Sequence, residues 1–438
     1  MNNKISLSPH IVIVGGGASG LELAAKLGRK LGKSHKAQIT LVDSAPAHIW
    51  KPLLHEVASG TLDSNEDEIN YLAYANDHHF QFCLGTLQGL NRKEKNITLA
   101  PILDAQQHEF VPQRLLTYDV LIIAVGSTAN VFGTPGALEN CLFLDNLSQA
   151  NYFQQTLMQN LQRVAYQKSI GQIKPFTITV VGGGATGVEL TAELHSAIKQ
   201  IADNGSTLTL ADISITLIEA AERLLPALPT EISALTLQEL QRLNIQVLTG
   251  ARVSKVSAEG FFIQPDKFIP ADMKMWAAGI KAPDFLANLD GLAINRINQL
   301  QVKQTLQTTL DDAIFALGDC ASCPQAGTEQ TVPPRAQAAH QQASFLLKAL
   351  QCYFNKKPLP LYRYQDFGSL VSLGEGKTVG SLISKISKNM VIKGRFARLA
   401  YLSLYKMHLT ALYGLWRVVL LTVINSVSRG RKKRLKLH

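Results

Sequence analysis

Two stretches of the chain carry glycines at the spacing that suits a dinucleotide-binding turn. Each has the pattern G-x-G-x-x-G, with Gly15, Gly17 and Gly20 in the first and Gly182, Gly184 and Gly187 in the second. The first glycine of such a triplet permits a tight turn, the second lets backbone approach a pyrophosphate, and the third lets the next helix pack closely. The pyrophosphate would lie at the helix N-terminus, where free N–H groups favour an anion.

An acidic residue follows each glycine-rich stretch. The segment Ile39-Thr-Leu-Val-Asp43 ends in aspartate, and Ile215-Thr-Leu-Ile-Glu219 ends in glutamate. A carboxylate at this place accepts hydrogen bonds from ribose hydroxyls and repels the 2′-phosphate of NADPH. The two acids therefore favour NADH over NADPH, although Arg223, close to Glu219, could soften the preference.

The elements that must hold these residues form a repeated unit, because Val14–Leu23 aligns with Val181–Leu190. In each copy an apolar segment predicts a strand before the turn, an amphipathic helix follows, and the acid closes a second strand. The predicted first strands are His10–Val14 and Phe176–Val181.

Three further apolar segments are predicted as buried strands that end at small residues. In each nucleotide unit such a strand would bring backbone close to the bound dinucleotide, and the third would place a carboxylate at a strand terminus. The segments are 117–126, 272–279 and 312–320, and their ends carry Gly126, then Ala278 with Gly279, then Gly318 with Asp319.

The order of these motifs resembles that of the two-dinucleotide-binding flavoprotein superfamily. Within it, further stretches resemble bacterial type II NADH:quinone oxidoreductases, and the resemblance runs over essentially the whole chain. The matching stretches are His48–Ala58, Gly182–Leu190, Trp276–Asp284, Gly318–Ala321 and Pro333–Gln341.

The resemblance implies that FAD, tightly but not covalently bound, occupies the first fingerprint. Asp319 of the Gly-Asp motif would hydrogen-bond the ribityl chain of the flavin, and Lys51 with Pro52 would approach the flavin ring. The residues expected to bind FAD are Gly15, Gly17, Gly20, Asp43, Lys51, Gly126, Asp319 and Ala336.

The resemblance also implies that NADH visits the second fingerprint as a substrate. Glu189 matches the position of a glutamate that the family places near the nicotinamide and flavin and links to proton or charge transfer. Glu22 is its counterpart in the first copy, so a structural role for both stays open. The residues expected to bind NADH are Gly182, Gly184, Gly187, Glu219, Ala278 and Gly279.

A glutamine pair follows the Gly-Asp motif. Gln337 and Gln341 lie four residues apart and hence on one helix face, and their neutral amides suit quinone carbonyls. They fit the A-Q-x-A-x-Q pattern of the family, which begins at Ala336. The expected reaction passes a hydride from NADH to the flavin and two electrons to membrane quinone, without proton pumping, with Glu189, Gln337 and Gln341 as the catalytic residues.

The segment Cys320-Ala-Ser-Cys323 raises the alternative of disulfide chemistry. Disulfide reductases of the superfamily carry a cysteine pair after the first fingerprint or inside the NADH domain, where this chain has none, so a structural role is expected. Sulfide:quinone oxidoreductase is a closer alternative that the complete second fingerprint disfavours, and a flavin- and NADH-binding redox sensor is another. Two cysteines without further ligands make an incomplete metal site, so no metal is expected.

The C-terminal part is predicted to attach the protein to a membrane. From Arg395 onward the sequence predicts an amphipathic helix, which Gly414 would divide, but charges recur too often for the about 20 apolar residues of a membrane span. A helix packed on the protein's own core is the alternative. Interfacial anchors would be Tyr401, Tyr405, Tyr413 and Trp416, and the basic tail has Arg429, Arg431, Lys432, Lys433, Arg434 and Lys436.

The formal net charge of +10 agrees with an anionic partner surface. The apolar helix beside the basic tail favours anionic lipid over nucleic acid as that partner. The odd number of five cysteines and the polar N-terminal segment are typical of a cytoplasmic protein. We therefore expect a peripheral protein on the cytoplasmic face of the bacterial inner membrane, with membrane quinone as its partner and a homodimer as one oligomeric state.

The sequence thus predicts an α/β fold with two Rossmann-like dinucleotide-binding domains, glutathione-reductase-like, and a C-terminal amphipathic helical membrane-anchoring region. Its length suffices for about three domains of ordinary size. The expected segments are 1–145 and 281–350 for the FAD-binding domain, 146–280 for the NADH-binding domain and 351–438 for membrane association.

Overall fold

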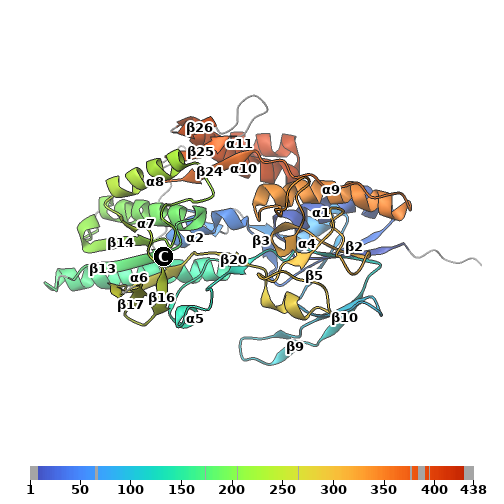
Figure 1. The fold of residues 1–438 in the computed structure, drawn as a ribbon, viewed down its shortest axis with the longest axis horizontal. Helices are drawn as coiled ribbons and strands as arrows, with labels where there is room; N and C mark the ends of the chain where they lie inside the picture. The colour runs from blue at the N-terminus through green and yellow to red at the C-terminus, as the bar shows by residue number, and fades with distance from the viewer. Residues whose placement is uncertain are drawn as a thin grey trace, which may run out of the picture. The chain divides into compact units, whose positions relative to one another are not determined.

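The computed structural model describes residues 8–64, 68–172, 174–204, 206–264, 266–374, 377–382, 390–393 and 395–428. The chain divides into two compact units (Figure 1). The first unit comprises residues 1–50, 68–128 and 280–365, and the second comprises residues 51–67, 129–279 and 366–438. The short strands β12 (Thr128–Ala129) and β20 (Ile280–Lys281) lie where the chain passes from one unit to the other.

A parallel sheet of five strands forms the centre of the first unit. Apart from the edge strand Gln81–Leu84, whose residues are exposed or partly buried, its strands are mostly buried and apolar, as expected for a parallel sheet covered on both faces. The strand at the centre of the sheet coincides with the predicted segment His10–Val14, and it pairs with Val120–Ile123 on one side and Gln38–Asp43 on the other. The order is β22 (Ile314–Ala316), β11 (Val120–Ile123), β1 (His10–Val14), β2 (Gln38–Asp43) and β5 (Gln81–Leu84).

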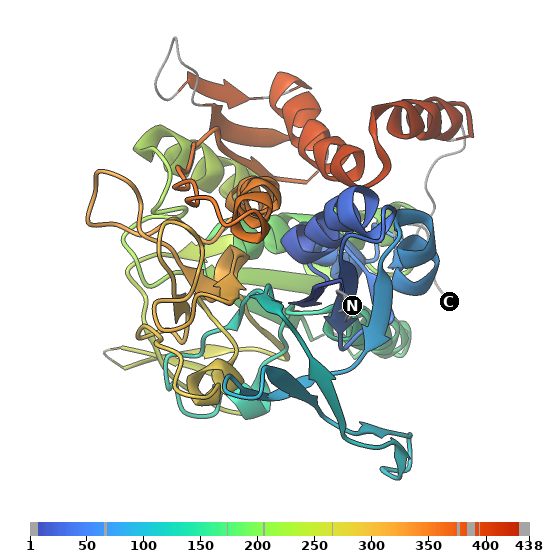
Figure 2. The ribbon, with the colours of Figure 1, turned by 90° about the vertical axis from the view of Figure 1, so that its right-hand side faces the viewer.

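Helices and small sheets complete the first unit. The helix α1 (Ala18–Leu27), continued by the π-helical turn η1 (Gly28–Gly32), packs along α9 (Ala336–Phe354), as Figure 1 shows. The hairpin of β8 (Ile102–Leu103) and β9 (Glu109–Val111) extends away from the sheet in Figure 2. The other elements are α4 (Tyr71–His78), β3 (Ala47–His48) with β4 (Ile69–Asn70), β6 (Leu87–Asn91), β7 (Asn96–Leu99) and β10 (Arg114–Thr117), η4 (Asp284–Asn288), η5 (Gly318–Cys320), and β21 (Leu300–Gln301) with β23 (Ala321–Ser322).

The second unit repeats the parallel sheet with four strands. The strand β13 again coincides with the predicted segment, and β14 ends one residue before Glu219. The helix α7 (Ala185–Asp203) follows the second glycine turn, as α1 follows the first. The strand order is β15 (Gln246–Leu248), β14 (Ile213–Ile218), β13 (Phe176–Val181) and β19 (Met273–Trp276).

Further helices and an antiparallel sheet surround this second sheet. The helix α2 (Leu54–Ser59), which follows the turn η2 (Lys51–Leu53), packs against α6 (Leu147–Ser169) and α7. The sheet consists of β16 (Val253–Val256), β17 (Gly260–Ile263) and β18 (Lys267–Pro270), and the remaining elements are α5 (Ala137–Asn140), η3 (Leu210–Asp212) and α8 (Thr230–Arg242).

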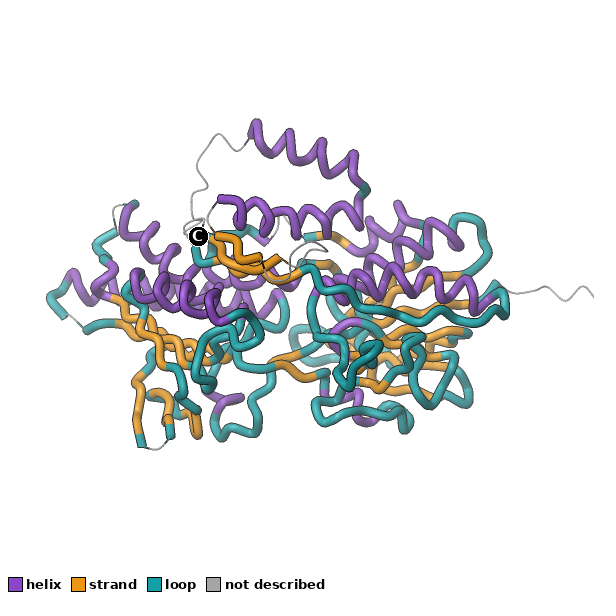
Figure 3. The backbone as a smooth tube through the Cα atoms, turned by 45° about the horizontal axis from the view of Figure 1, so that its top comes forward, coloured by secondary structure: helices purple, strands orange, loops and turns teal. Residues whose placement is uncertain are grey.

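The C-terminal part of the second unit contains a sheet that the sequence patterns did not reveal. The antiparallel strands β24 (Gly368–Ser372), β25 (Thr378–Leu382) and β26 (Met390–Lys393) precede α10 (Arg395–Tyr413), which packs on them. The predicted division at Gly414 is confirmed: its φ of +83° ends α10, and α11 (Leu415–Ser428) begins one residue later (Figure 3). Within the described parts of the chain, no helix is long and apolar enough to cross a membrane.

The break at Gly414 changes the amphipathic face expected for one continuous helix. On one continuous helix Met407 and Val418 would share the apolar side, yet Met407 is 59% exposed and Val418 only 4% exposed. In α10, His408 and Leu412 are buried, so part of this helix packs on the protein's own core. The basic tail after Ser428 lies outside the described residues.

Candidate functional site

The first glycine turn joins β1 to α1 at the carboxyl end of the central sheet. Gly15 has a φ of +105°, and a Cβ there would lie 2.4 Å from the Ala124 carbonyl oxygen. A Cβ on Gly20 would lie 1.8 Å from the Gly15 oxygen. Around Gly17, in contrast, no atom lies within 4 Å of such a Cβ. The turn therefore has no room for a side chain at Gly15 or Gly20, but it leaves space beside Gly17, which is the N-cap of α1.

The carboxylate of Asp43 is held against this turn. The Gly16 N–H donates to Oδ2 at 2.5 Å, and the Ala45 N–H donates to Oδ1 at 2.8 Å. Burial raises the pKa of Asp43, and these backbone donors oppose that effect. Tyr71 donates its hydroxyl proton to the Gly16 carbonyl at 2.7 Å, so the loop is fixed before any ligand binds.

The Gly-Asp motif lies at the end of β22 in the same unit. The Ser127 hydroxyl, one residue after Gly126, donates to Oδ2 of Asp319 at 2.9 Å. The Gly318 N–H donates to Oε1 of Gln342 at 2.7 Å. The structure thus brings the residue after Gly126 into contact with Asp319.

Gln342 is a site residue that the sequence analysis missed. Its side chain is buried, and it connects α9 to the Gly-Asp turn. A signal was present, because Gln342 is a polar residue among the buried positions Ala338, Ala339 and Leu346 of an otherwise apolar helix face.

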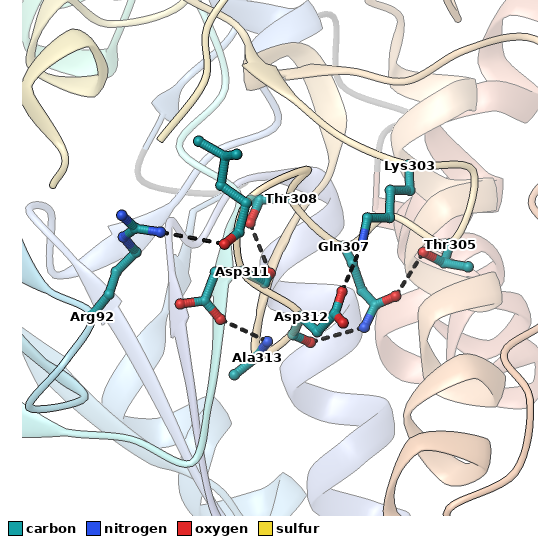
Figure 4. Close-up of polar contacts among 9 residues, drawn as sticks. Arg92, Lys303, Thr305, Gln307, Thr308, Asp311, Asp312 and Ala313 are labelled. Carbon is teal, nitrogen blue, oxygen red and sulfur yellow. Dashed lines mark hydrogen bonds and ion pairs between the residues drawn. The ribbon is translucent and has the colours of Figure 1, made fainter. Parts of the chain in front are cut away.

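A network of polar contacts fixes the loop that enters β22 (Figure 4). Gln307 donates its amide to the Asp312 carbonyl at 2.9 Å, and the Ala313 N–H donates to the Asp311 carboxylate at 2.9 Å. Lys303 forms an ion pair with Asp312 at 2.7 Å. These contacts position the strand, and hence the turn that carries Asp319.

The predicted quinone motif lies on the first turns of α9. Ala336 is the first residue of the helix, and Gln337 follows it partly buried. Both polar atoms of the Gln341 amide bond to the backbone of Gln365: Nε2 donates to its carbonyl at 2.7 Å, and Oε1 accepts from its N–H at 3.0 Å. Gln341 therefore ties α9 to the segment that follows it, which helical spacing alone could not predict.

The second glycine turn repeats the geometry of the first. Gly182 has a φ of +112°, and its Cβ would lie 2.6 Å from the Ala278 nitrogen, while a Cβ on Gly187 would lie 1.9 Å from the Gly182 oxygen. No atom lies within 4 Å of a Cβ on Gly184. The backbone of Ala278 thus leaves no room for a side chain at Gly182, as the backbone of Ala124 leaves none at Gly15 in the first unit.

Glu219 occupies the place that Asp43 has in the first unit. The Gly183 N–H donates to Oε2 at 2.5 Å, and the Ala221 N–H donates to Oε1 at 2.7 Å. The Arg223 guanidinium turns to the loop that follows and donates to the carbonyls of Leu228 at 2.8 Å and Pro226 at 2.7 Å. Arg223 thus braces this loop and does not pair with Glu219.

Gly279 marks the end of the segment after β19. Its φ is +66°, and a Cβ there would lie 2.2 Å from Cζ of Phe132. Phe132 is 64% exposed and was not found from the sequence. An exposed aromatic ring against a required glycine offers an apolar wall beside the second turn.

The two glutamates at equivalent positions of the repeat have opposite surroundings. Glu22 on α1 is buried and forms ion pairs with Lys26 and His340. Burial alone would raise its pKa, but the contacts with His340 and Lys26 outweigh burial and leave the pKa lowered. Glu22 is therefore ionised and ties α1 to α9.

Within the described part of the chain, no lysine or arginine forms an ion pair with Glu189 on α7. Burial raises its pKa to about 8, and the nearby Glu56 and Glu193 add to the shift. Nδ1 of the His55 imidazole lies 3.9 Å from Oε2 of Glu189, and burial lowers the pKa of His55 to about 4. Glu189 is therefore protonated near neutral pH, so the equivalence to Glu22 in sequence does not extend to chemistry.

Lys51 belongs to the second unit. Its Nζ lies 3.7 Å from Oδ1 of Asp145, and its side chain is 45% exposed. This cationic group lies at the start of the turn η2 that leads into α2.

Cys320 and Cys323 are buried free thiols. Burial raises the pKa of each to about 12, so both stay protonated at neutral pH. The Cys320 thiol donates to the carbonyls of Leu317 at 3.3 Å and Ile123 at 3.5 Å. Protonated, enclosed thiols are poor nucleophiles, which agrees with a structural role.

Both turns fit a dinucleotide. Each presents open space above its second glycine, free N–H groups at a helix N-terminus and a carboxylate fixed by backbone donors, so a pyrophosphate and a ribose find matching groups. The first site adds Asp319 beside Ser127 in its own unit. The residues present can therefore hold one dinucleotide in each unit.

Comparison with known proteins agrees with this geometry. The family described as "Pyridine nucleotide-disulphide oxidoreductase" matches residues 9–343. A type II NADH:quinone oxidoreductase of Haemophilus influenzae is 42% identical over 443 residues, which cover 98% of this chain and 100% of that protein.

Solved structures agree on the fold. NDH2 from Plasmodium falciparum in complex with NADH has a TM-score of 0.80 at 21% identity and covers 97% of this chain and 99% of that chain. Sulfide:quinone oxidoreductase from Aquifex aeolicus has a TM-score of 0.72 at 16% identity, with 98% of each chain covered. From the extent of the family match and the identity to the Haemophilus protein, the chain belongs to the pyridine nucleotide-disulphide oxidoreductase family and, within it, to the type II NADH:quinone oxidoreductases.

Proposed function

We propose that this chain oxidises NADH and reduces a membrane quinone to quinol, with FAD as its resident cofactor. The observation that carries the proposal is the repeated turn, in which Asp43 and Glu219 are held by the backbone N–H groups of Gly16 and Gly183 in the same way. Two such sites in a type II family member suit one resident and one visiting dinucleotide. The overall reaction is NADH + H⁺ + quinone to NAD⁺ + quinol.

The first site is assigned to FAD. Its pyrophosphate would lie over the open Gly17 and its ribose at Asp43, and the Asp319 carboxylate, oriented by Ser127, would accept a hydrogen bond from the flavin side chain. The residues proposed to hold FAD are Gly15, Gly17, Gly20, Asp43, Lys51, Gly126, Asp319 and Ala336.

The second site is assigned to NADH. The fixed carboxylate of Glu219 would accept hydrogen bonds from the adenosine ribose, and it disfavours the 2′-phosphate of NADPH by charge repulsion. The residues proposed to hold NADH are Gly182, Gly184, Gly187, Glu219, Ala278 and Gly279.

Bound flavin would supply the redox chemistry, and the chain would orient the reactants and manage protons. Glu189 holds a proton near neutral pH and is proposed to supply it during turnover. Gln337 is proposed to donate its amide to a quinone carbonyl. Gln341 is proposed to contribute to the same site by holding the backbone of Gln365.

The protein is proposed to be peripheral, on the cytoplasmic face of the bacterial inner membrane. The helix α11 exposes apolar side chains that suit the interface of an anionic membrane, and the basic tail would add electrostatic attraction. A functional division into segments 1–145, 146–280, 281–350 and 351–438, and a homodimer, are further parts of this proposal. The exposed side chains of α11 are Leu415, Trp416, Val419 and Leu420.

The proposal is tested with the purified full-length protein. We expect a yellow protein from which denaturation releases FAD, and which oxidises NADH and reduces a water-soluble quinone in a ratio of one to one. NADH consumption without quinol formation would reject the quinone assignment. A long-lived NADH complex without turnover would indicate a redox sensor, and quinone reduction by sulfide instead of NADH would indicate the sulfide-oxidising alternative.

A further inference from the structure

The carboxyl group of Glu189 is enclosed by groups from several elements of the second unit. The Ser372 N–H of β24 donates to Oε1 at 3.0 Å, and the Tyr401 hydroxyl of α10 donates a hydrogen bond to the same carboxyl group. The His55 ring of α2 faces Oε2. The donors that hold Glu189 thus come from the C-terminal part of the chain and not from the nucleotide-binding repeat.

The described side chains of His55, Glu56 and Glu193 near Glu189 do not stabilise its ionised form. His55 is buried, and its lowered pKa keeps it neutral near pH 7. Glu56 of α2 and Glu193 of α7 repel a negative charge on Glu189. Among the residues that the structure describes, no lysine or arginine forms an ion pair with Glu189, in contrast to Glu22.

Tyr401 is suited to be a permanent donor. Burial raises the pKa of its hydroxyl well above the ordinary value, and the negative potential of Glu189, Glu56 and Glu193 acts in the same direction. The proton therefore stays on Tyr401 at any working pH. The helix α10 that carries Tyr401 packs on β24 and β25, so the Ser372 donor and the Tyr401 donor belong to one packed substructure.

We propose that Tyr401 is a positioning residue for Glu189, so that the C-terminal helix α10 sets both the orientation and the proton occupancy of this carboxyl group. The inference rests on the proposed function, in which Glu189 supplies a proton during turnover. A hydroxyl that donates to a carboxylate favours its ionised form. Loss of the Tyr401 hydroxyl would therefore move the ionisation of Glu189 to higher pH.

The test is the variant Tyr401→Phe, which keeps the buried ring and removes the hydroxyl. In the wild type, kcat with NADH and a water-soluble quinone should fall on the alkaline side near pH 8. In Tyr401→Phe we expect this fall at a pH at least about half a unit higher, because one donor to the carboxylate is gone. FAD content and the KM for NADH should stay within about twofold of the wild type, since Tyr401 belongs to neither turn. The matched control is Ser403→Ala, which removes from the same helix a hydroxyl that donates to the Ala400 carbonyl.

A second measurement distinguishes the expected effect from poor folding of the variant. Infrared difference spectra of the flavin-loaded protein should show the C=O band of one protonated carboxylic acid, absent in Glu189→Gln and shifted in frequency in Tyr401→Phe. An unchanged pH profile and band in an active Tyr401→Phe enzyme would overturn the inference and leave the proposed function intact. Absence of NADH:quinone turnover in the wild type would instead reject the proposed function itself.

Discussion

At the scale of single residues, Glu22 and Glu189 show how position in a repeat and chemical state can separate. Each lies two residues after the last glycine of its turn, and each is buried. Lys26 and His340 surround the first, whereas a neutral imidazole and two further acids surround the second. The first is thereby an ion-pair anchor, whereas the second is protonated near neutral pH.

The two glutamates should respond oppositely to neutralisation. Glu22 has a lowered pKa in the folded state, so it stabilises the fold above its unfolded-state pKa and loses this contribution as the pH falls. The variant Glu22→Gln should lower the free energy of unfolding near pH 7 by about 3 kcal/mol, because it leaves Lys26 and His340 without their carboxylate. Urea denaturation of the flavin-loaded protein measures this difference.

Glu189 has a raised pKa of about 8, so its contribution to stability is present at low pH and is lost as the pH rises from the unfolded-state value through about 8. Glu189→Gln, which cannot ionise, should be close to the wild type near pH 5 and more stable than the wild type near pH 9. Equal effects of Glu189→Gln at the two pH values would contradict a protonated Glu189.

Glu219 should control the choice of nicotinamide cofactor. Glu219→Gln removes the negative charge but keeps an oxygen that can accept from Gly183, so the turn should survive. We expect kcat/KM for NADH to fall about tenfold, which corresponds to about 1.4 kcal/mol, and the preference over NADPH to shrink by more than this. The control is Glu222→Gln at an exposed neighbouring position; an equal change in both variants would argue against the assignment.

At the scale of elements, the strand–turn–helix unit explains why both sites are built alike. A strand buried on both faces ends at a glycine of positive φ, and the helix returns so closely that its third glycine touches the first. Space remains above the second glycine of each turn. The same backbone path thus makes two sites, and their use differs only through neighbouring segments.

The third glycines allow the two sites to be disabled separately. Because a Cβ at Gly20 would meet the Gly15 oxygen at 1.8 Å, Gly20→Ala should shift α1 and yield protein with little FAD. Gly187→Ala should retain FAD and raise the KM for NADH at least about tenfold, a cost of about 1.4 kcal/mol in binding. Flavin absorbance per protein and initial rates of NADH oxidation measure the two effects. Loss of flavin in Gly187→Ala with retention in Gly20→Ala would reverse the assignment.

At the scale of the whole molecule, the C-terminal part contains two helices with different surroundings. The helix α10 is built into the second unit, with His408 and Leu412 buried, whereas α11 presents Trp416 at 85% exposure and Leu420 at 60%. The nucleotide repeat is thus joined to an apolar exposed helix through a helix that also contacts Glu189.

Removal of the exposed apolar residues of α11 should release the protein from membranes. The double variant Trp416→Ser with Leu420→Ser should bind vesicles of anionic phospholipid at least about tenfold more weakly, since it removes the side chains that would enter the interface. FAD content and turnover of a water-soluble quinone should be unchanged. Tyr152→Ser, which removes a 61% exposed aromatic residue on α6, is the control. Equal vesicle binding by all three proteins would contradict membrane docking through α11.

Local sequence patterns predict much of the fold and the path of the backbone at both turns. The strands before both turns, the acid at or directly after the end of each second strand, the Gly-Asp motif after β22, the start of α10 at Arg395 and its end before Gly414 follow from apolar runs and glycine positions. Backbone geometry of this kind depends on residues a few positions apart, so the order of residues suffices to predict it.

Only the tertiary structure decided which side chains meet across the chain. Gln342 reaches the Gly318 turn, Gln341 binds the backbone of Gln365, and Arg223 turns to its own loop, none of which spacing along one helix or strand determines. The same holds for Glu22 and Glu189, which have equivalent positions in the repeat. A pKa depends on burial and on partners from distant segments, and His340 and Tyr401 come from such segments, so the charge of each glutamate was settled by packing and not by its place in the sequence.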